Sequence, residues 1–269
     1  MLPSRLFPQI LPCCLIPILT CDVILFVVRN QKIFVPAFTL IELLTVIAII
    51  GILAAMLLAV FSSAINAAKS AKAKTEMSGL VTAIQGYDSD YGRFPVSPAV
   101  QNLASAANSD FTYGGSLLAA YASDIGPGNY TNDNSEVIAI LMDITNYPGG
   151  GWTVNTNHLK NPRRTAYLNA RMSGDTQSPG VGNDLVYRDP WGNPYVITMD
   201  LNYNEVCEDA FYKSAAVSGG GLNGLILQPD GNYAFRGTVM VWSAGPNKSI
   251  DPDDPATDHE NHDNVLSWK

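Results

Sequence analysis

Residues 37–68 read AFTLIELLTVIAIIGILAAMLLAVFSSAINAA, and Glu42 is the only charged residue among them. Residues 43–61 are apolar apart from Thr45 and Gly51. As a helix, a stretch of this length crosses the hydrocarbon core of a bilayer, which is about 30 Å thick. One interpretation is therefore a plain transmembrane anchor. Glu42 favours a second one, because a carboxylate within the apolar edge of such a segment costs free energy and indicates a use.

The helical pattern continues beyond the apolar run. Residues 62–92 are rich in Ala and Lys, and Gly92 suits a C-terminal cap, while Pro95 cannot continue a helix. The sequence predicts one helix of about 50 residues, roughly 75 Å long, whose second half packs on a soluble head. The apolar positions of that half recur at mostly helical spacing: Ile65, Met77, Leu80, Val81 and Ile84.

The rest of the chain predicts short helices followed by strands. Residues 93–183 hold Gly, Asn, Ser and Pro clusters around helical stretches at 116–122 and 135–145, and we interpret them as a variable αβ connecting region. Strand-like segments follow at 185–188, 195–199, 224–228 and 233–243. Asp230 and Gly231 lie between two apolar runs and predict a hairpin. An antiparallel sheet laid on the amphipathic half-helix buries both apolar faces, so we expect an α+β head.

Charge and cysteine content exclude some classes of function. The net charge is −8, and residues 1–37 carry three basic side chains and one acidic one, which leaves −10 for residues 38–269. Such an acidic body repels phosphate backbones, so no nucleic-acid partner is expected. Cys13, Cys14 and Cys21 lie in the first 37 residues, and only Cys207 lies beyond them. We expect Cys207 to be a small buried hydrophobe, the alternative being a reactive thiol.

No catalytic constellation is recognised, and the chain is not expected to be an enzyme. Residues 219–224, GGGLNG, fit the spacing of a dinucleotide fingerprint, but that fingerprint needs a strand before it and a helix after it, so we interpret them as a flexible loop. His259 and His262 flank an acidic residue, Glu260, in oxygen-rich surroundings without cysteine. They are interpreted as solvated loop histidines, the alternative being metal ligands.

Residues 38–44, FTLIELL, followed by residues 46–54, VIAIIGILA, resemble the class III signal of type IV pilins and of type II secretion pseudopilins. The resemblance implies that a prepilin peptidase cuts between Ala37 and Phe38, that the new amine of Phe38 is methylated, and that residues 1–37 are a leader. The family normally has Gly where this chain has Ala37. The resemblance also implies that Glu42 pairs with the α-amine of a neighbouring subunit inside an apolar filament core.

A second resemblance lies in residues 184–269. Residues 189–195, DPWGNPY, are similar to a segment of major pseudopilins, and residues 243–247, SAGPN, with 263–268, DNVLSW, resemble their calcium loop. The implied cofactor is Ca²⁺, bound between Ser243 and Asp263, and Asp263 is the expected side-chain ligand. Asn247 stands where the family usually has Asp, and Asp251 and Asp253 are the carboxylates that could compensate. Oxygen donors suit Ca²⁺, and the alternative is a solvated acidic tail.

Together the resemblances imply a pilin fold in five parts: a leader at 1–37, a transmembrane helix at 38–61, its amphipathic continuation at 62–92, the connecting region at 93–183, and a sheet with an acidic loop at 184–269. The implied function is a type II secretion pseudopilus subunit in the bacterial inner membrane, with its head in the periplasm. Its partners would be further copies of itself, minor pseudopilins, the prepilin peptidase, the inner-membrane secretion platform and membrane lipid.

Two alternatives remain open from the sequence. One is a type IV pilus subunit for adhesion, motility or DNA uptake. A typical major pilin closes a C-terminal loop with a disulfide, which Cys207 alone cannot form after cleavage, so the cysteine pattern favours secretion. The other alternative is a membrane-tethered binding protein or hydrolase, which would need a catalytic constellation in residues 97–183.

Overall fold

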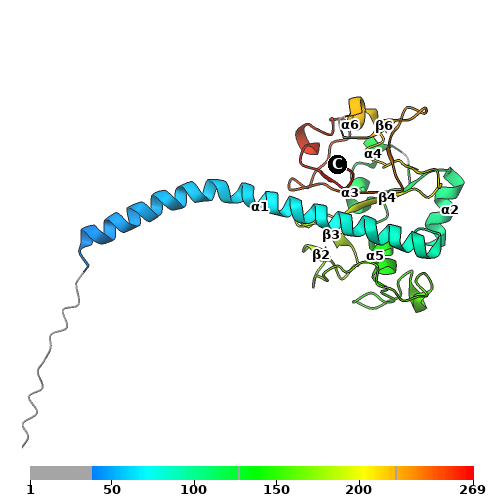
Figure 1. Ribbon diagram of the computed structural model, residues 1–269, viewed down its shortest axis with the longest axis horizontal. Coiled ribbons are helices and arrows are strands. Elements are labelled where there is room, and N and C mark those ends of the chain that lie inside the picture. Colours follow the sequence, from blue (N-terminus) through cyan, green and yellow to red (C-terminus); the bar gives the residue numbers. More distant parts are fainter. Residues whose placement is uncertain (1–37, 127, 222) are drawn as a thin grey trace, which may run out of the picture. The chain divides into compact units, whose positions relative to one another are not determined.

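The computed structural model describes residues 38–269 except Pro127 and Leu222, so the predicted leader and Ala37 lie outside the described residues. The chain divides into a first unit that ends at Ile52 and a second unit, Leu53–Lys269. The fold is α+β, with one long helix and antiparallel sheets, as expected. Helix α1 (Leu40–Tyr91) runs through both units (Figure 1).

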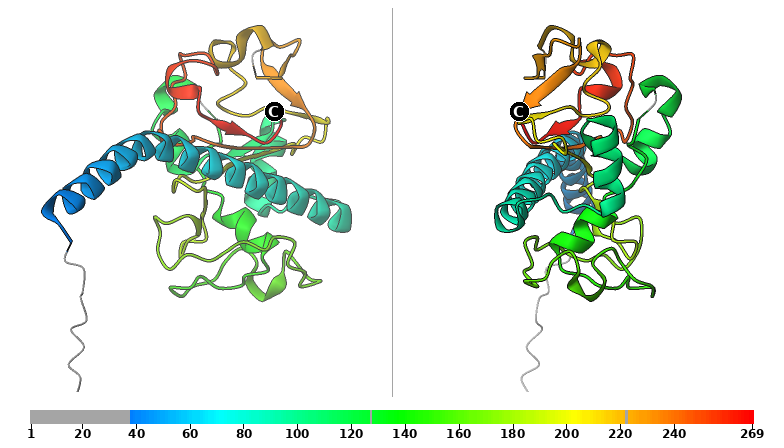
Figure 2. Two further views of the ribbon diagram at one scale, coloured as in Figure 1. Left: turned by 60° about the vertical axis from the view of Figure 1, so that its left-hand side comes forward. Right: turned by 90° about the vertical axis from the view of Figure 1, so that its right-hand side faces the viewer.

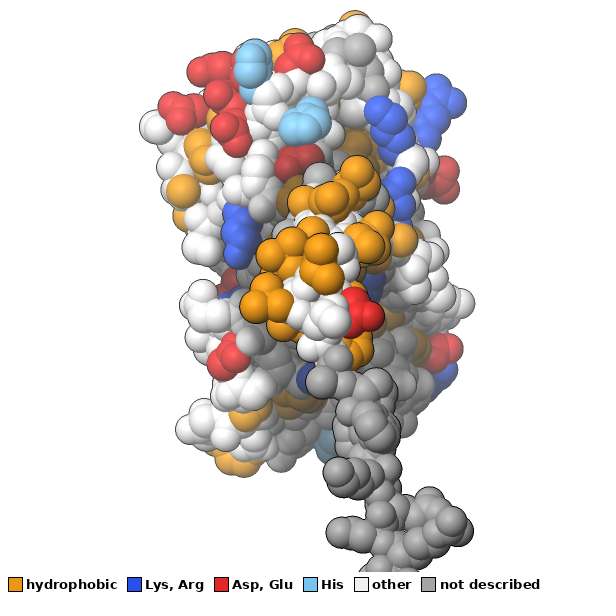
Figure 3. All heavy atoms as spheres, turned by 90° about the vertical axis from the view of Figure 1, so that its left-hand side faces the viewer, with side chains coloured by type: hydrophobic (Ala, Val, Ile, Leu, Met, Phe, Trp, Pro, Cys, Tyr) orange, Lys and Arg blue, Asp and Glu red, His pale blue; other side chains and the backbone are white. Residues whose placement is uncertain are grey.

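Helix α1 has the extent that the sequence predicts. It contains 52 residues and ends at Tyr91. Gly92 follows with a φ of +62°, which glycine adopts without strain, and its N–H donates to the carbonyl oxygen of Asp88 at 2.7 Å. Among the described residues, α1 is one helix that is long and apolar enough to cross a membrane. In the first unit its side chains are exposed, and Figure 3 shows the hydrophobic ones on the surface.

The second unit is organised around a four-stranded antiparallel sheet. Its strands lie in the order β1 (Phe111–Tyr113), β4 (Val196–Met199), β8 (Val239–Ser243) and β9 (Val265–Leu266). β4 and β8 form its centre, and every pairing in it is antiparallel. The connecting region therefore supplies the edge strand β1, so it forms part of the main sheet.

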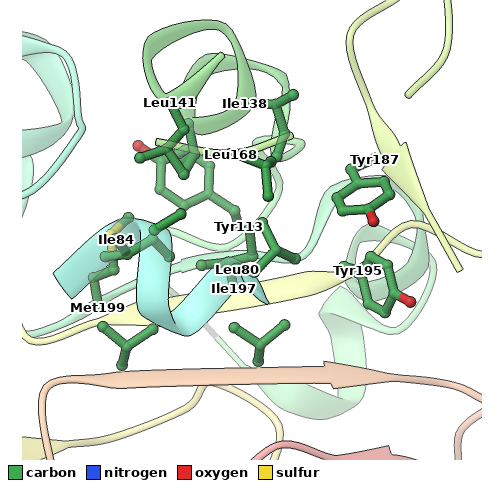
Figure 4. Close-up of a cluster of buried hydrophobic side chains, with 14 of the residues drawn as sticks. Leu80, Ile84, Tyr113, Ile138, Leu141, Leu168, Tyr187, Tyr195, Ile197 and Met199 are labelled. Atoms are coloured by element: carbon green, nitrogen blue, oxygen red, sulfur yellow. The ribbon is translucent and has the colours of Figure 1, made fainter. Parts of the chain in front are cut away.

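The two faces of this sheet bury different clusters, because successive side chains of a strand point to opposite faces. Ile197 and Val241 belong to the cluster that contains the buried side of α1. Val196, Met240 and Trp242 belong to a second cluster, together with residues of the C-terminal segments. Side chains of α1, α5 (Ser135–Leu141) and β4 meet in the first cluster (Figure 4). The sheet is thus covered on both faces.

Shorter elements complete the second unit. The hairpin predicted at Asp230 and Gly231 is confirmed, because Leu227 pairs with Tyr233 across it. The remaining helices are α2 (Pro98–Ala107), α3 (Gly115–Ala119), α4 (Ala122–Ile125) and α6 (Ala215–Ser218). Three 3₁₀ turns are described: η1 (Thr156–His158), η2 (Gly219–Gly221) and η3 (His259–Asn261). One small sheet pairs β2 (Gly180–Val181) with β3 (Tyr187–Arg188), and another pairs β7 (Tyr233–Arg236) with β5 (Val206–Cys207) and β6 (Ile226–Leu227).

Several predicted segments are shorter or broken in the structure; the strands expected at 185–188 and 224–228 are reduced to β3 and β6, of two residues each. The strand expected at 233–243 is two strands, β7 and β8, which belong to different sheets; the chain changes sheets at Gly237, whose N–H donates to the carbonyl of Glu205 at 3.1 Å. The helix expected at 116–122 is divided between α3 and α4. The helix expected at 135–145 ends at Leu141, and Asp143 has a φ of +56°, which a helix does not tolerate.

The connecting region is fastened to the C-terminal end of α1 by tyrosines. The hydroxyl of Tyr87 donates to the carbonyl oxygen of Lys160 at 2.5 Å. The hydroxyl of Tyr167 donates to Asp90 at 2.5 Å, and Arg163 forms an ion pair with the same carboxylate at 2.7 Å. Both views in Figure 2 show these green loops on one side of α1 and the orange and red C-terminal segments on the other. This attachment places Lys160 and Arg163 beside the end of α1.

Candidate functional site

The first candidate site is the start of α1, where Thr39 and Glu42 form a capping box. The carboxylate of Glu42 accepts from the backbone N–H of Thr39 at 2.8 Å and from its hydroxyl at 2.7 Å. In return the N–H of Glu42 donates to the hydroxyl oxygen of Thr39 at 3.3 Å. This reciprocal pattern satisfies donors that a helix start leaves without partners. Glu42 thus has a local structural role that the sequence interpretation did not include.

The surroundings of Glu42 in the first unit are apolar and exposed. Phe38, Leu40 and Ile41 have exposed fractions of 75%, 81% and 69%. A contiguous apolar surface of this kind is unfavourable in water and is expected to be buried against membrane lipid or against other apolar helices. A carboxylate buried in the same cover needs a cationic partner, since an unpaired buried charge costs about 3–5 kcal/mol. The described residues supply Glu42 with hydrogen bonds from Thr39 and with no ion pair.

The second candidate site is the turn at residues 189–195, which is built on the buried Asp189. Its Oδ1 accepts from the N–H groups of Trp191 and Asn193 at 2.8 and 2.9 Å. Its Oδ2 accepts from Nδ2 of Asn193 at 2.9 Å and from the hydroxyl of Ser243. Burial raises the pKa of the Asp189 carboxyl, and these hydrogen bonds act in the opposite direction. Asp189 therefore fixes both the turn and the end of β8.

The same turn contacts α1 and the C-terminal loop. The indole N–H of Trp191 donates to Oδ1 of Asn66 at 3.4 Å, and the Tyr195 hydroxyl donates to Glu76 at 2.6 Å. On the other side, Nδ2 of Asn193 donates to the carbonyl oxygen of Gly245 at 2.7 Å. The segment that resembles major pseudopilins is thus a bridge between the amphipathic half of α1 and the loop after β8.

The loop between β8 and β9, residues 244–264, is held in place by hydrogen bonds of the buried Asn261. Its Oδ1 accepts from the N–H of Asp251 at 2.9 Å. Its Nδ2 donates to the carbonyl oxygens of Asp251 and Asp254 at 2.7 and 2.8 Å. One amide therefore satisfies three backbone groups of the acidic segment. The loop is ordered by a neutral side chain, although it is rich in carboxylates.

Two of the four predicted calcium residues lie next to one another. The N–H of Asn247 donates to Oδ2 of Asp263 at 3.2 Å, and its Nδ2 donates to the carbonyl and carboxylate oxygens of Glu260 at 2.7 and 3.1 Å. Gly245 has a φ of +69°, and a Cβ there would lie 2.3 Å from the carbonyl oxygen of Asp263. Only glycine permits this close approach of the two ends of the loop.

Asp251 and Asp253 form a separate turn, in which the N–H of Asp253 donates to Oδ1 of Asp251 at 2.9 Å. In the described part of the chain, no group of three or more His, Cys, Asp or Glu side chains is close enough together to hold a metal ion. The inclusion of these two carboxylates in a calcium site stays a prediction.

Asp263 fits a cation better than its neighbours do. Its Oδ1 is buried and has no hydrogen-bond partner among the described residues, and burial raises the pKa of its carboxyl. A buried acceptor without a donor is a costly arrangement that a cation relieves. Any Ca²⁺ bound here would draw on Asp263, on Glu260 and on loop carbonyl groups, because Ca²⁺ takes six to eight oxygens.

A pocket of about 910 Å³ separates this loop from α1 in the second unit. Ser62, Asn66 and Lys74 line it from the helix, Asp263 lines it from the loop, and Leu266 lines it from β9. The apolar run of the sequence ends at residue 61, so the pocket opens where α1 becomes amphipathic. The loop at residues 244–264 is therefore next to the part of α1 that directly follows the apolar run.

The remaining predicted residues have ordinary surroundings. Cys207 is fully buried, and burial raises the pKa of its thiol well above the usual value, as expected for a structural cysteine. His259 is exposed and pairs with Asp254 at 2.9 Å, and His262 is exposed as well. Residues 219–221 form a short turn after α6, and no strand precedes them directly, so a dinucleotide fingerprint is excluded.

Sequence reasoning missed the residues that organise the site through neutral or internal hydrogen bonds. Thr39 was readable as the first residue of a T-x-x-E capping box. Asn193 and Asn261 gave only the general signal of asparagine in a turn. Asp209 gave no signal, although its buried carboxylate accepts from the N–H groups of Phe211 and Tyr212.

Comparisons with protein-family models, with curated proteins and with solved structures find no match to this chain. The geometry of its own residues therefore carries the functional argument.

Proposed function

We propose that the chain is a pilin-like structural subunit, cut before Phe38 and polymerised from the bacterial inner membrane into a type II secretion pseudopilus. The observation that carries the proposal is α1. Its first part is exposed and apolar with one carboxylate, Glu42, at its start, and the same helix continues into the core of the head through Met77, Leu80 and Ile84.

This arrangement suits a subunit that first sits in a membrane and then stacks. An apolar helix of this length is stable in hydrocarbon, and the same surface packs against equivalent helices when subunits leave the bilayer. In a stack with an axial offset, the carboxylate of Glu42 meets the α-amine of a neighbour's Phe38. Removal of a leader creates that amine, so processing and assembly are linked through one ion pair.

A type IV pilus subunit is the alternative from the same class of protein. Both functions would use α1 in the same way, as a membrane anchor and then as a stacking helix. The turn at residues 189–195 and the loop at 244–264 favour secretion, because both resemble major pseudopilins. The membrane-tethered binding protein or hydrolase is not favoured, since residues 97–183 contribute to the fold: they supply β1, α5 and contacts with the tyrosines of α1.

The test is expression of the chain in bacteria that have an active prepilin peptidase and a type II secretion assembly platform. Sheared surface fractions are examined for filaments by electron microscopy and immunolabelling. Filaments that contain the chain support the proposal. Membrane-bound chain that never enters a sedimentable filament, with a functional pseudopilin as positive control, would overturn it.

A further inference from the structure

A pocket at the C-terminal end of α1 is lined by two basic side chains that form no ion pair with the described residues. It has a volume of about 330 Å³, and Arg93 and Lys160 line it. None of the ion pairs between described residues includes either side chain. Burial and the charge of Arg93 lower the pKa of the Lys160 ammonium, while Glu136 opposes that shift. Two cations are therefore held facing one cavity.

Glu136 is already committed to other donors. Its Oε1 accepts from the N–H of Ser97 at 2.6 Å and from the hydroxyl of Tyr113 at 2.8 Å. The pocket also lies beside the start of α2, where Ser97 is the N-cap and the helix dipole favours negative charge. These features together suit an incoming carboxylate.

The surrounding sequence extends the basic character. Residues 144–174 contain four basic residues, Lys160, Arg163, Arg164 and Arg171, and no Asp or Glu. They belong to a chain whose residues 38–269 otherwise carry a strong negative charge. Arg163 is paired with Asp90, and Arg171 lines a different pocket, beside Lys72 and Glu76, so Arg93 and Lys160 are the basic residues at this pocket. Unpaired basic side chains on an otherwise acidic protein favour an anionic partner.

The chain itself carries a matching acidic surface. Residues 246–263 contain six Asp and Glu residues against Lys248 alone, and Asp253, Asp258 and Glu260 are exposed. Figure 3 shows carboxylates gathered beside histidine side chains on one part of the surface. We call residues 246–263 the acidic loop. It borders residues 62–74 of α1, whereas the basic pocket follows Tyr91.

The two surfaces are too far apart to meet within one subunit. Between Ser70 and Tyr91 the helix rises by roughly 30 Å, at about 1.5 Å per residue. Two copies displaced along α1 bring the basic end of one next to the acidic end of the other. Contact between unlike surfaces is the heterologous type, which generates open helical polymers, whereas pairing of like surfaces would oppose equal charges.

We infer that the Arg93–Lys160 pocket of one subunit receives carboxylates of the acidic loop of a second copy of this chain. The inference rests on the proposed filament and adds the contact that sets the axial order of its heads. The contact is electrostatic, so it fixes orientation and responds to salt.

The test places cysteines at two uncharged exposed positions, Asn102 at the pocket and Thr257 in the acidic loop, in the full-length chain in membranes and sheared filaments, with Cys13, Cys14 and Cys21 replaced by serine. After mild oxidation, Asn102→Cys with Thr257→Cys should give disulfide-linked dimers and ladders. Each single variant, and Asn102→Cys with Thr176→Cys outside the acidic loop, should give background only. Cross-linking should fall several-fold when the salt concentration rises to about 1 M, where the screening length is about 3 Å.

Charge reversal provides the second arm. Arg93→Glu with Lys160→Glu should reduce cross-linking about tenfold or more, because like charges across an interface are strongly unfavourable. Adding Asp253→Lys and Asp258→Lys should restore it. Arg236→Glu, at the exposed last residue of β7, is the control and should leave cross-linking unchanged. Thermal melting confirms that each variant is folded.

The outcomes separate this contact from the proposed function. The contact would be overturned by two results together: normal filaments from the Arg93→Glu, Lys160→Glu variant, and no cross-link between positions 102 and 257 in the chain without charge reversal. The proposed filament would then still stand. Absence of wild-type filaments would overturn the proposed function, and cross-linking in membranes then decides the contact alone. Stabilisation by inorganic phosphate that Arg93→Glu abolishes, without any cross-link, would assign the pocket to a small anion and contradict the inference.

Discussion

The carboxylate of Glu42 accepts hydrogen bonds from the N–H and the hydroxyl of Thr39, at 2.8 and 2.7 Å, and so closes the start of α1. This contact makes Glu42→Ala an ambiguous test of inter-subunit pairing, because the variant loses both the cap and the charge. Glu42→Gln separates them, since Gln also completes a capping box.

We expect Glu42→Gln to insert in the membrane with a normal helix start and to lose filament assembly, since only the charge is removed. Thr39→Ala is the matched control: it weakens the cap by about 1 kcal/mol and keeps the charge, so assembly should persist. The yield of sheared filaments is the measurement. Full yield from Glu42→Gln would show that the charge has no pairing role.

The calcium expectation is tested on the full chain in detergent. Millimolar Ca²⁺ should raise the melting temperature relative to EDTA, because a ligand that binds only the native state stabilises it by RT ln(1 + [L]/Kd). Asp263→Asn keeps an acceptor for the N–H of Asn247 and removes the charge, so it should abolish the rise while the metal-free melting temperature stays nearly unchanged. Identical wild-type curves in EDTA and Ca²⁺ would eliminate the site.

Asp209 should be a large contributor to the stability of the head. Its buried carboxylate accepts from the Thr198 hydroxyl at 2.6 Å, from the Trp242 indole at 3.0 Å and from two backbone N–H groups. Asp209→Ala leaves these donors unpaired and should cost about 3 kcal/mol or more in the free energy of unfolding. The exposed Asp124→Ala should cost less than about 0.5 kcal/mol. Denaturant titration distinguishes them.

Asp110 should make stability depend on pH. Burial, with the nearby charges of Asp200 and Glu208, raises its pKa from 3.8 to about 7. The folded state therefore binds more protons than the unfolded state between these values, and stability falls as pH rises from about 4 to about 7, by at most about 1.4 kcal/mol per pH unit. Asp110→Asn keeps an acceptor for the N–H of Glu208 and should remove this contribution. An unchanged slope would contradict it.

The long helix and the fold class were predictable because their signals are local and strong. An uninterrupted apolar run and the Gly92 stop define α1, and the Asp230–Gly231 turn defines one hairpin. The edge strand β1 was missed because it is three residues long and its pairing partner, β4, lies more than 80 residues away. No periodicity can emerge from so short a segment.

The site was predictable where it depends on charge, and not where it depends on amides. Glu42 and Asp263 stand out as isolated or motif-bound carboxylates. Asn261 and Asn193 do not, because asparagine in a turn is common and its long-range acceptors depend on how the loops fold. The opposed charges of Arg93 and Lys160 and of residues 246–263 were visible in the sequence, but their meaning depends on where the fold places them along α1, beside Tyr91 and beside residues 62–74.

Mass spectrometry of the N-terminal peptide, from membranes of cells with an active prepilin peptidase, tests the central claim most directly. The predicted result is a chain that begins at Phe38 with a methylated amine. The Phe38→Ala variant should be cut at the same position, as the mass of its N-terminal peptide will show. A chain that retains residues 1–37 in those cells would contradict the proposal that this protein is a processed, filament-forming subunit.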